Sequence, residues 1–320
     1  MKKNQIQLVE LPSELGAGTR GASLGSAAMK IAALKQHNFL FKDYPTLLVE
    51  TENHRLLSPD RINNYAKQIE GILLTYQRQI AALGQVFGDK KFPIVLSGDH
   101  SCGGATIAAV KNAFPDKTLG VVWIDAHADL HTPYTTPSGN MHGMPLGVSL
   151  GLDNLNQQRN AISPKTAEMW NELKNLGGIS PKIRPEHLAF VGLRSTEMEE
   201  NYLLDSLKIA QHSVEKLQEF GAVKIAEEIL EQLAACDLIY VSFDVDSMDC
   251  EIVSRGTGTP VKDGLLPQEA ILLINTLLKE PKTCCLEITE VNPTLDNKRN
   301  LMAETAFAIL QSAISTVESR

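Results

Sequence analysis

The hydrophobic residues of the chain gather in short continuous runs, separated by longer segments with helical spacing. Continuous apolar runs are typical of strands that are covered on both faces, whereas strands with one solvated face alternate between apolar and polar residues. The runs that fit this description are Ile6–Leu11, Leu47–Glu50, Pro93–Leu96, Gly120–Ile124, Leu188–Gly192, Leu238–Phe243 and Cys284–Ile288. The pattern therefore predicts a buried sheet.

The segments between these runs carry signals for the beginning and the end of helices. Ser58 and Pro59 offer an N-cap and a first-turn proline, and Gly84 can close that helix. Further helices are predicted over Thr166–Leu176, from Pro267 to just before Pro281, and over Asn300–Val317. Because strands and helices alternate, we expect an α/β fold with a mostly parallel sheet and helices on both faces.

The length of 320 residues is within reach of one large α/β domain. Hydrophobic residues make up 43% of the chain, which is enough for a sizeable core, but aromatic residues make up only 5%. The core must therefore consist mainly of Leu, Ile, Val and Ala. The chain shows no linker, low-complexity stretch or internal repeat, so we expect a single domain over residues 1–320.

The charge balance excludes several classes of partner. The formal net charge is −8 and the pI is near 5.5, without a Lys/Arg-rich run, which argues against nucleic acid and against an anionic membrane surface. No apolar run reaches the ~18 residues of a membrane span, and the first residues lack the apolar core of a secretory signal. The five cysteines are odd in number and form no CxxC pair, which favours a reduced, cytoplasmic location.

Clusters of ionisable residues follow directly after predicted strands. Ligands of open α/β sheets bind beyond the carboxyl ends of the strands, so these clusters are the place to look for chemistry. The strand over residues 93–96 leads into Gly98-Asp99-His100, and the one over residues 120–124 leads into Asp125-Ala126-His127-Ala128-Asp129. The strands over residues 238–243 and 284–288 lead into Asp244-Val245-Asp246 and into Glu287-Ile288-Thr289-Glu290.

The spacing within these clusters points to bound cations. Asp125, His127 and Asp129 alternate, so in an extended chain they project to one side, and Asp244 and Asp246 do the same. A single Asp or His at a strand end is most often a cap or a turn former. Several carboxylates on one side repel strongly unless a cation neutralises them. The clusters together therefore predict a metal site.

The ligand types restrict which metal is bound. Two imidazoles and four carboxylates without a thiolate disfavour a structural zinc site or an iron–sulfur cluster, and Mg²⁺ seldom takes imidazole. Six protein ligands fit two ions, for which Mn²⁺ is the first choice and Fe²⁺ or Co²⁺ are substitutes. Two such ions can lower the pKa of a bridging water and supply hydroxide as a nucleophile, which predicts a binuclear hydrolase.

The motifs GDHS, DAHAD and SFDVDSMD, in this order, resemble the three signature blocks of the ureohydrolases, the family of arginases, agmatinases and their relatives. The resemblance extends from about Glu14 to Phe307. It implies a three-layer α/β/α sandwich, two Mn²⁺ ions per subunit and assembly into homotrimers or hexamers. By the family pattern, one ion would be held by His100, Asp125, Asp129 and Asp244, and the other by Asp125, His127, Asp244 and Asp246, so that Asp125 and Asp244 bridge.

Within the family, the segment Thr132–Gly143 resembles the loop with which arginases bind the α-carboxylate of an amino acid. Ser138 and Asn140 are the matching positions, and their neutral donors suit a carboxylate. His142 matches the family histidine that passes protons to the departing amine. Glu290 matches the carboxylate that clamps the guanidinium group. The resemblance thus implies a guanidino amino acid as substrate.

Other positions depart from the arginase pattern. Arginases usually have Asn where this chain has His131. In the block that contacts the α-amino group, Ser195 replaces one aspartate and Glu197 stands for the other, while the neighbouring glutamates at 199 and 200 leave that assignment open. The stretch Cys250–Gly256 also differs and is one residue longer, before Thr259, a neighbour of the guanidinium side, restores the match. These departures bear on substrate choice and leave the predicted metal ligands unchanged.

The first hypothesis is an arginase, in which hydroxide attacks the guanidinium carbon of L-arginine and releases urea and L-ornithine. Asp129 would orient the nucleophile and Glu290 would position the substrate. The alternative is another ureohydrolase: an agmatinase, a guanidinobutyrase or a formimidoylglutamase. A non-catalytic relative is disfavoured because all six metal ligands are intact, and a binuclear phosphatase because the pocket offers a glutamate instead of Arg or Lys for phosphate.

Overall fold

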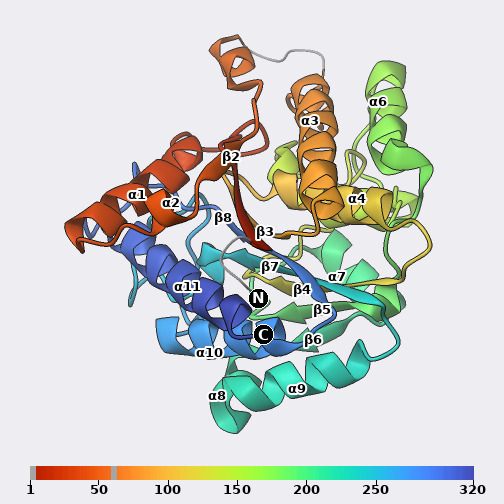
Figure 1. Cartoon of the computed structure of the whole chain (residues 1–320). Helices are drawn as coiled ribbons and strands as arrows, with labels where there is room; N and C mark the ends of the chain where they lie inside the picture. The colour runs from red at the N-terminus through yellow and green to blue at the C-terminus, as the bar shows by residue number, and fades with distance from the viewer. Residues whose placement is uncertain (1–4, 59–62) are drawn as a thin grey trace.

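A parallel sheet runs through the centre of the computed structural model, which describes residues 5–58 and 63–320 (Figure 1). Its strands are β1 (Ile6–Leu11), β2 (Thr46–Leu48), β3 (Phe92–Ser97), β4 (Leu119–Ile124), β5 (Leu188–Val191), β6 (Ala210–His212), β7 (Leu238–Asp244) and β8 (Thr283–Thr289). Over the described residues, the sheet has eight strands in the order β2-β1-β3-β8-β7-β4-β5-β6, and every neighbouring pair is parallel.

The strands predicted from the apolar runs are all present, with ends that differ by at most two residues. The sequence missed β6, a strand of three residues at the edge of the sheet. The sequence pattern missed β6 for a physical reason. An edge strand has a neighbouring strand on one side only, and Gln211 in the middle of β6 is exposed. Such a strand lacks the continuous apolar run that marks the central strands.

Helices cover both faces of the sheet, so the predicted three-layer α/β/α sandwich is confirmed (Figure 1). One layer consists of α1 (Gly25–Lys35), α2 (Leu40–Asp43), α8 (Val214–Phe220), α9 (Ala222–Gln232), α10 (Pro267–Lys279) and α11 (Leu301–Glu318). The other layer consists of α3 (Ile69–Gly88), α4 (Ser101–Ala113), α5 (Pro145–Ser149), α6 (Pro164–Asn175) and α7 (Met198–Ser206). Across the described ranges, none of these helices combines the length and the apolar character that crossing a bilayer requires.

The helices predicted around residues 166–176, 267–280 and 300–317 match α6, α10 and α11 to within two residues. Ser163 caps α6, because its side chain accepts a hydrogen bond from Thr166 N. The helix predicted to start at Ser58-Pro59 and to close at Gly84 does not match the bounds of α3. Residue 59 lies outside the described residues, α3 begins at Ile69, and the helix continues past Gly84 to Gly88.

Successive residues of the central strands pack into different layers. In β4, Val122 and Ile124 belong to the core cluster formed with α8–α11, whereas Val121 and Trp123 belong to the cluster formed with α4 and α5. Both clusters are fully shielded from solvent, and each buried aliphatic or aromatic side chain contributes about 1.5–3 kcal/mol. Burial on two sides is why these strands read as continuous apolar runs.

The fold brings the carboxyl ends of β3, β8, β7 and β4 together in the middle of the sheet. Close backbone packing fixes the end of β3 in particular. Gly98 N donates to Leu11 O at 2.9 Å, and Glu290 N donates to Gly98 O at 2.9 Å. The segment that carries Asp99 and His100 is therefore held by backbone hydrogen bonds of Gly98 to the ends of β1 and β8.

We predict that Gly98→Ala lowers the free energy of unfolding by about 1–3 kcal/mol. The added methyl group would lie 2.0 Å from Ser13 O, a backbone atom that cannot move independently. Gly84→Ala is the matched control, because a methyl group there meets no atom within 4 Å in the described structure, and alanine favours helix by up to about 1 kcal/mol. Urea unfolding of both variants measures the difference, and equal stabilities would contradict the close packing at Gly98.

Candidate metal centre

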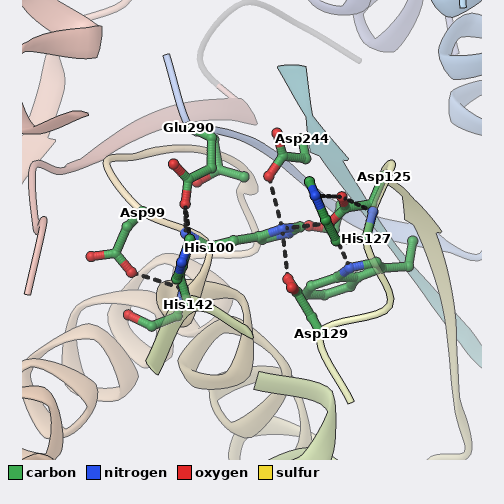
Figure 2. A network of polar contacts seen from close by, with 12 residues as sticks. Asp99, His100, Asp125, His127, Asp129, His142, Asp244 and Glu290 are labelled. Atoms are coloured by element: carbon green, nitrogen blue, oxygen red, sulfur yellow. Dashed lines mark hydrogen bonds and ion pairs between the residues drawn. The ribbon is translucent and has the colours of Figure 1, made fainter. Parts of the chain in front are cut away.

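The predicted metal ligands converge at the carboxyl end of the sheet (Figure 2). They are His100 after β3, Asp125, His127 and Asp129 after β4, and Asp244 and Asp246 at the end of β7. All of them except His127 are buried. Two groups of these side chains have donor atoms close enough to share one ion each: His100, Asp125 and Asp129, and Asp125, His127 and Asp246.

The first group centres on the Nδ1 atom of His100. This atom lies 2.9 Å from Asp125 Oδ2, 3.1 Å from Asp129 Oδ2 and 3.2 Å from Asp244 Oδ2. Within the described part of the chain, neither His100 Nδ1 nor Asp129 Oδ2 has a hydrogen-bond partner, although both are buried. Buried polar atoms are almost always partnered. A cation coordinated by these atoms would account for both exceptions, so the donor set fits a metal ion.

The second group centres on the Nδ1 atom of His127. This atom lies 3.0 Å from Asp246 Oδ2 and 3.5 Å from Asp125 Oδ1. Thr259 donates a hydrogen bond to Asp246 Oδ2 at 2.9 Å. Asp125 is common to the two groups, since one of its oxygens faces His100 and the other faces His127. This is the placement that a carboxylate bridging two ions requires.

The electrostatics of the centre also favour cations. Burial, together with the charge of Asp125, raises the pKa of Asp129 to about 6. Burial and the charges of Asp246 and Asp125 raise the pKa of Asp244 well above its usual range. Divalent cations act in the opposite sense, because they favour ionised carboxylates. The four aspartates are thus costly as a group of side chains alone and suited to two metal ions.

Two supporting side chains were missed by the sequence interpretation. The ring of Trp123 stacks on the ring of His100 with 4.0 Å between centroids, and Trp123 Nε1 donates to Asp125 Oδ2 at 3.0 Å. Ser242 Oγ lies 2.7 Å from His100 Nε2, which directs the other ring nitrogen to the carboxylates. A signal was available, because Trp123 and Ser242 each stand two residues before an aspartate of the centre and project to the same side of their strand.

Glu290 and His142 form a pair beside the metal ligands (Figure 2). His142 Nδ1 lies 3.2 Å from Glu290 Oε1, which also accepts a hydrogen bond from His100 N at 2.9 Å. Burial lowers the pKa of His142, but the hydrogen bond and charge of Glu290 outweigh it and raise the pKa to about 9. Glu290 and Asp129 both adopt left-handed backbone conformations, with φ of 65° and 52°. Strained backbone of this kind concentrates at functional sites.

A cavity of about 260 Å³ opens over the centre. Its lining includes the residues predicted to contact the substrate, namely His131, Ser138, Asn140, His142, Glu197 and Thr259. Glu290 is not part of the lining; its side chain lies deeper, with 1% of its surface exposed. The stretch over residues 250–256 also does not line the cavity, so its difference from arginases lies outside the pocket wall.

The structure shows which of the glutamates at 197, 199 and 200 face the cavity. Glu197 and Glu200 line the cavity, whereas Glu199 points to Arg159, with 3.0 Å between Oε1 and Nη1. His131 joins them, since its Nε2 lies 3.1 Å from Glu197 Oε2 and 3.8 Å from Glu200 Oε2. Its Nδ1 contacts Thr135 Oγ1 at 3.1 Å. Both nitrogens of His131 are therefore engaged by the protein.

The surroundings of the two glutamates shift their pKa values in opposite directions. The hydrogen bond from His131 lowers the pKa of Glu197 to about 2. Burial raises the pKa of Glu200 to about 8. The two pKa shifts run in opposite directions, so Glu197 is the carboxylate of this wall that is held in its ionised form beside the imidazole of His131.

A parallel α/β sheet with two His–Asp groups at its carboxyl end, each able to hold a metal ion, is the arrangement expected for a hydrolase of the ureohydrolase type. The chain belongs to the arginase family, because its residues 4–315 match the sequence pattern of that family.

Individual relatives agree with this membership. The chain is 31% identical over 313 residues to an arginase of Bacillus subtilis (strain 168), with 97% of both chains covered. The solved structure of the arginase from Bacillus caldovelox has a TM-score of 0.81 at 30% identity, covering 100% of this chain and 99% of that one. The structure of the Entamoeba histolytica arginase in complex with L-ornithine has a TM-score of 0.81 at 25% identity, with the same coverage.

We predict that Asp125→Ala lowers the amount of Mn²⁺ bound per chain to less than half of that of the wild type, because Asp125 contributes an oxygen to both groups. The measurement is inductively coupled plasma mass spectrometry after loading with Mn²⁺ and desalting. Asp249→Asn is the matched control from the same motif. Asp249 accepts backbone hydrogen bonds from residues 251, 252 and 263 and contacts no predicted ligand, so the variant should keep its metal and lose only stability. Two ions retained by Asp125→Ala would contradict the shared role.

Proposed function

We propose that the protein hydrolyses L-arginine to L-ornithine and urea with two Mn²⁺ ions, for which Fe²⁺ or Co²⁺ can substitute. The observation that carries the proposal is a single cavity that joins three features. Predicted metal ligands form its floor, the Ser138–Asn140 loop and His142 line its wall, and Glu290 lies behind His142, below the lining. Family membership supports the reaction type, and the loop supports the amino-acid substrate.

The ligands proposed for one ion are His100, Asp125, Asp129 and Asp244, and those for the other are Asp125, His127, Asp244 and Asp246. The position of Asp125 between the two histidines supports its bridging role. When bound, two such ions supply a water of lowered pKa as the nucleophile for the guanidinium carbon. Asp129, which is one of the proposed ligands, would orient that water.

The guanidinium group is assigned to Glu290 and Thr259. Oε1 of Glu290 already accepts the contacts of His142 and His100, so the substrate would meet Oε2. Thr259 stands beside the second ion group through its hydrogen bond to Asp246. His142, with a pKa of about 9, is protonated at neutral pH and can donate a proton to the departing amine.

The amino-acid end of the substrate is assigned to the outer part of the cavity. Ser138 and Asn140 offer neutral donors to the α-carboxylate, and Glu197 offers an ionised carboxylate to the α-ammonium group. The similar Entamoeba histolytica arginase was solved with L-ornithine, the amino-acid product expected here.

The alternative is another ureohydrolase activity, as an agmatinase, a guanidinobutyrase or a formimidoylglutamase. The observation that favours it is His131, which replaces the asparagine of arginases and binds Glu197 instead of offering a free donor.

We further propose that the chain acts as a single domain over residues 1–320 and, by its family membership, assembles into trimers or hexamers. Light scattering measures the oligomeric state.

The test is a urea assay on manganese-loaded protein with L-arginine, and in parallel with agmatine and 4-guanidinobutyrate. We predict urea from L-arginine, with kcat/KM at least tenfold above that for the other two. Chelation of the metal or Asp129→Ala should abolish the activity. Urea from agmatine or 4-guanidinobutyrate alone would reject the assigned substrate and leave the metal centre standing.

The variant Glu290→Gln tests the role of the Glu290 charge in the same assay. Loss of a buried charge that faces a cation costs about 3–5 kcal/mol, so kcat/KM for L-arginine should fall by about 10²-fold or more. The manganese content should stay at the wild-type level, because Glu290 is not among the proposed ligands. Glu199→Gln is the matched control, since Glu199 faces Arg159 outside the cavity and its removal should leave kcat/KM within about twofold.

A further inference from the structure

A lysine outside the family motifs lies against the loop that is assigned to the α-carboxylate. Lys67 Nζ donates a hydrogen bond to Asn140 Oδ1 at 3.1 Å. The backbone of the same residue is also bound to the loop, since Lys67 N donates to Gly139 O at 2.9 Å. Two separate contacts therefore hold this residue, which precedes α3, against the segment that carries Ser138 and Asn140.

The two segments are shaped to fit one another. Gly139 has a φ of +77°, and a Cβ atom at this position would lie 1.9 Å from Asn64 O. The backbone of the loop thus approaches the segment before α3 as closely as a glycine permits. On the other side of the loop, a Cβ atom at Gly18 would lie 2.5 Å from Asn140 Nδ2. The half-buried amide of Asn140 lies between Gly18 and Lys67, with its oxygen accepting a hydrogen bond from the ammonium group of Lys67.

Lys67 does not line the cavity itself and reaches the cavity wall through Asn140. The described residues that line the cavity include no lysine or arginine. His131 is the nearest alternative, but Thr135 and Glu197 engage its two nitrogens. A substrate carboxylate that rests on Ser138 and Asn140 would thus have neutral donors alone from the lining, and an anion is better bound with a cation close by.

We propose that Lys67 is a specificity-determining residue that recognises the carboxylate of the guanidino substrate together with Asn140. This inference rests on the proposed function, because it requires a substrate with a carboxylate at that end. An ammonium group carries three donors, so Lys67 can hold Asn140 Oδ1 and donate to a carboxylate oxygen at the same time. The contact also turns the NH₂ group of Asn140 away from Lys67, which makes Lys67 a positioning residue for the loop.

The test compares L-arginine with agmatine, which is the same guanidino chain without the carboxylate. For Lys67→Met we expect the KM for L-arginine to rise about three- to fivefold, the upper part of the range for an exposed charged contact, with kcat within about twofold. The kcat/KM for agmatine should not change. Lys67→Arg keeps the charge and should restore the KM to within about twofold of wild type.

Lys165→Met is the matched control, because Lys165 is an exposed lysine of α6 that pairs with Glu70 and contacts no part of the loop. It should behave as the wild type with both substrates. Salt provides a second readout: raising the ionic strength should increase the KM for L-arginine in the wild type and have a smaller effect in Lys67→Met.

The outcomes separate the inference from the proposed function. If Lys67→Met changes L-arginine and agmatine by the same factor, or changes neither, the inference is overturned while the arginase activity stands. If the wild type hydrolyses 4-guanidinobutyrate instead of L-arginine, the proposed function fails and Lys67 is judged by its effect on that acid. If no compound is hydrolysed, calorimetric dissociation constants of L-arginine and agmatine decide, and equal effects of Lys67→Met on both overturn the inference.

Discussion

The mutual repulsion of buried carboxylates is the constraint on which the rest of the structure depends. Asp125, Asp129, Asp244 and Asp246 crowd around two histidines, and desolvation raises the pKa values of three of the four aspartates. A group of buried carboxylates without a counter-charge destabilises the folded state, and bound cations offset their repulsion. The sheet beneath the aspartates must therefore be rigid enough to hold them together, and two apolar layers that shield every central strand supply that rigidity.

The order of the strands turns distant motifs into one centre. β3, β8, β7 and β4 are neighbours in the sheet, although about 190 residues separate His100 from Glu290, the ends of the first two. Parallel pairing places all four carboxyl ends on one edge. The chain also accepts local strain there, since Asp129 and Glu290 adopt left-handed backbone conformations without being glycines. Hydrogen bonds from neighbouring segments, such as Glu290 N to Gly98 O, hold these conformations in place.

The centre and the pocket above it differ in how they are built. The predicted metal ligands stand at or just after strand ends, where their backbone is fixed by the sheet. The residues that would select the substrate stand on loops and at the start of α7. Three of the departures from the arginase pattern, at His131, Ser195 and Glu197, lie there. The interaction of Lys67 with Asn140 belongs to this outer part as well. Chemistry and selectivity can thus vary separately, because a change in a loop leaves the strand ends in place.

The sequence by itself determined the class of fold and predicted six metal ligands that the structure brings together. Continuous apolar runs predict strands buried on both faces, and Asp and His residues that alternate at the strand ends predict a cation site. Both signals can be read because they are local in the sequence. The sequence did not reveal β6, the start of α3, the pairing of His131 with Glu197 and Glu200, or the support given by Trp123 and Ser242. These depend on which elements become neighbours. Only the tertiary structure decided them, because the strand order and the packing of loops from distant parts of the chain set which side chains meet.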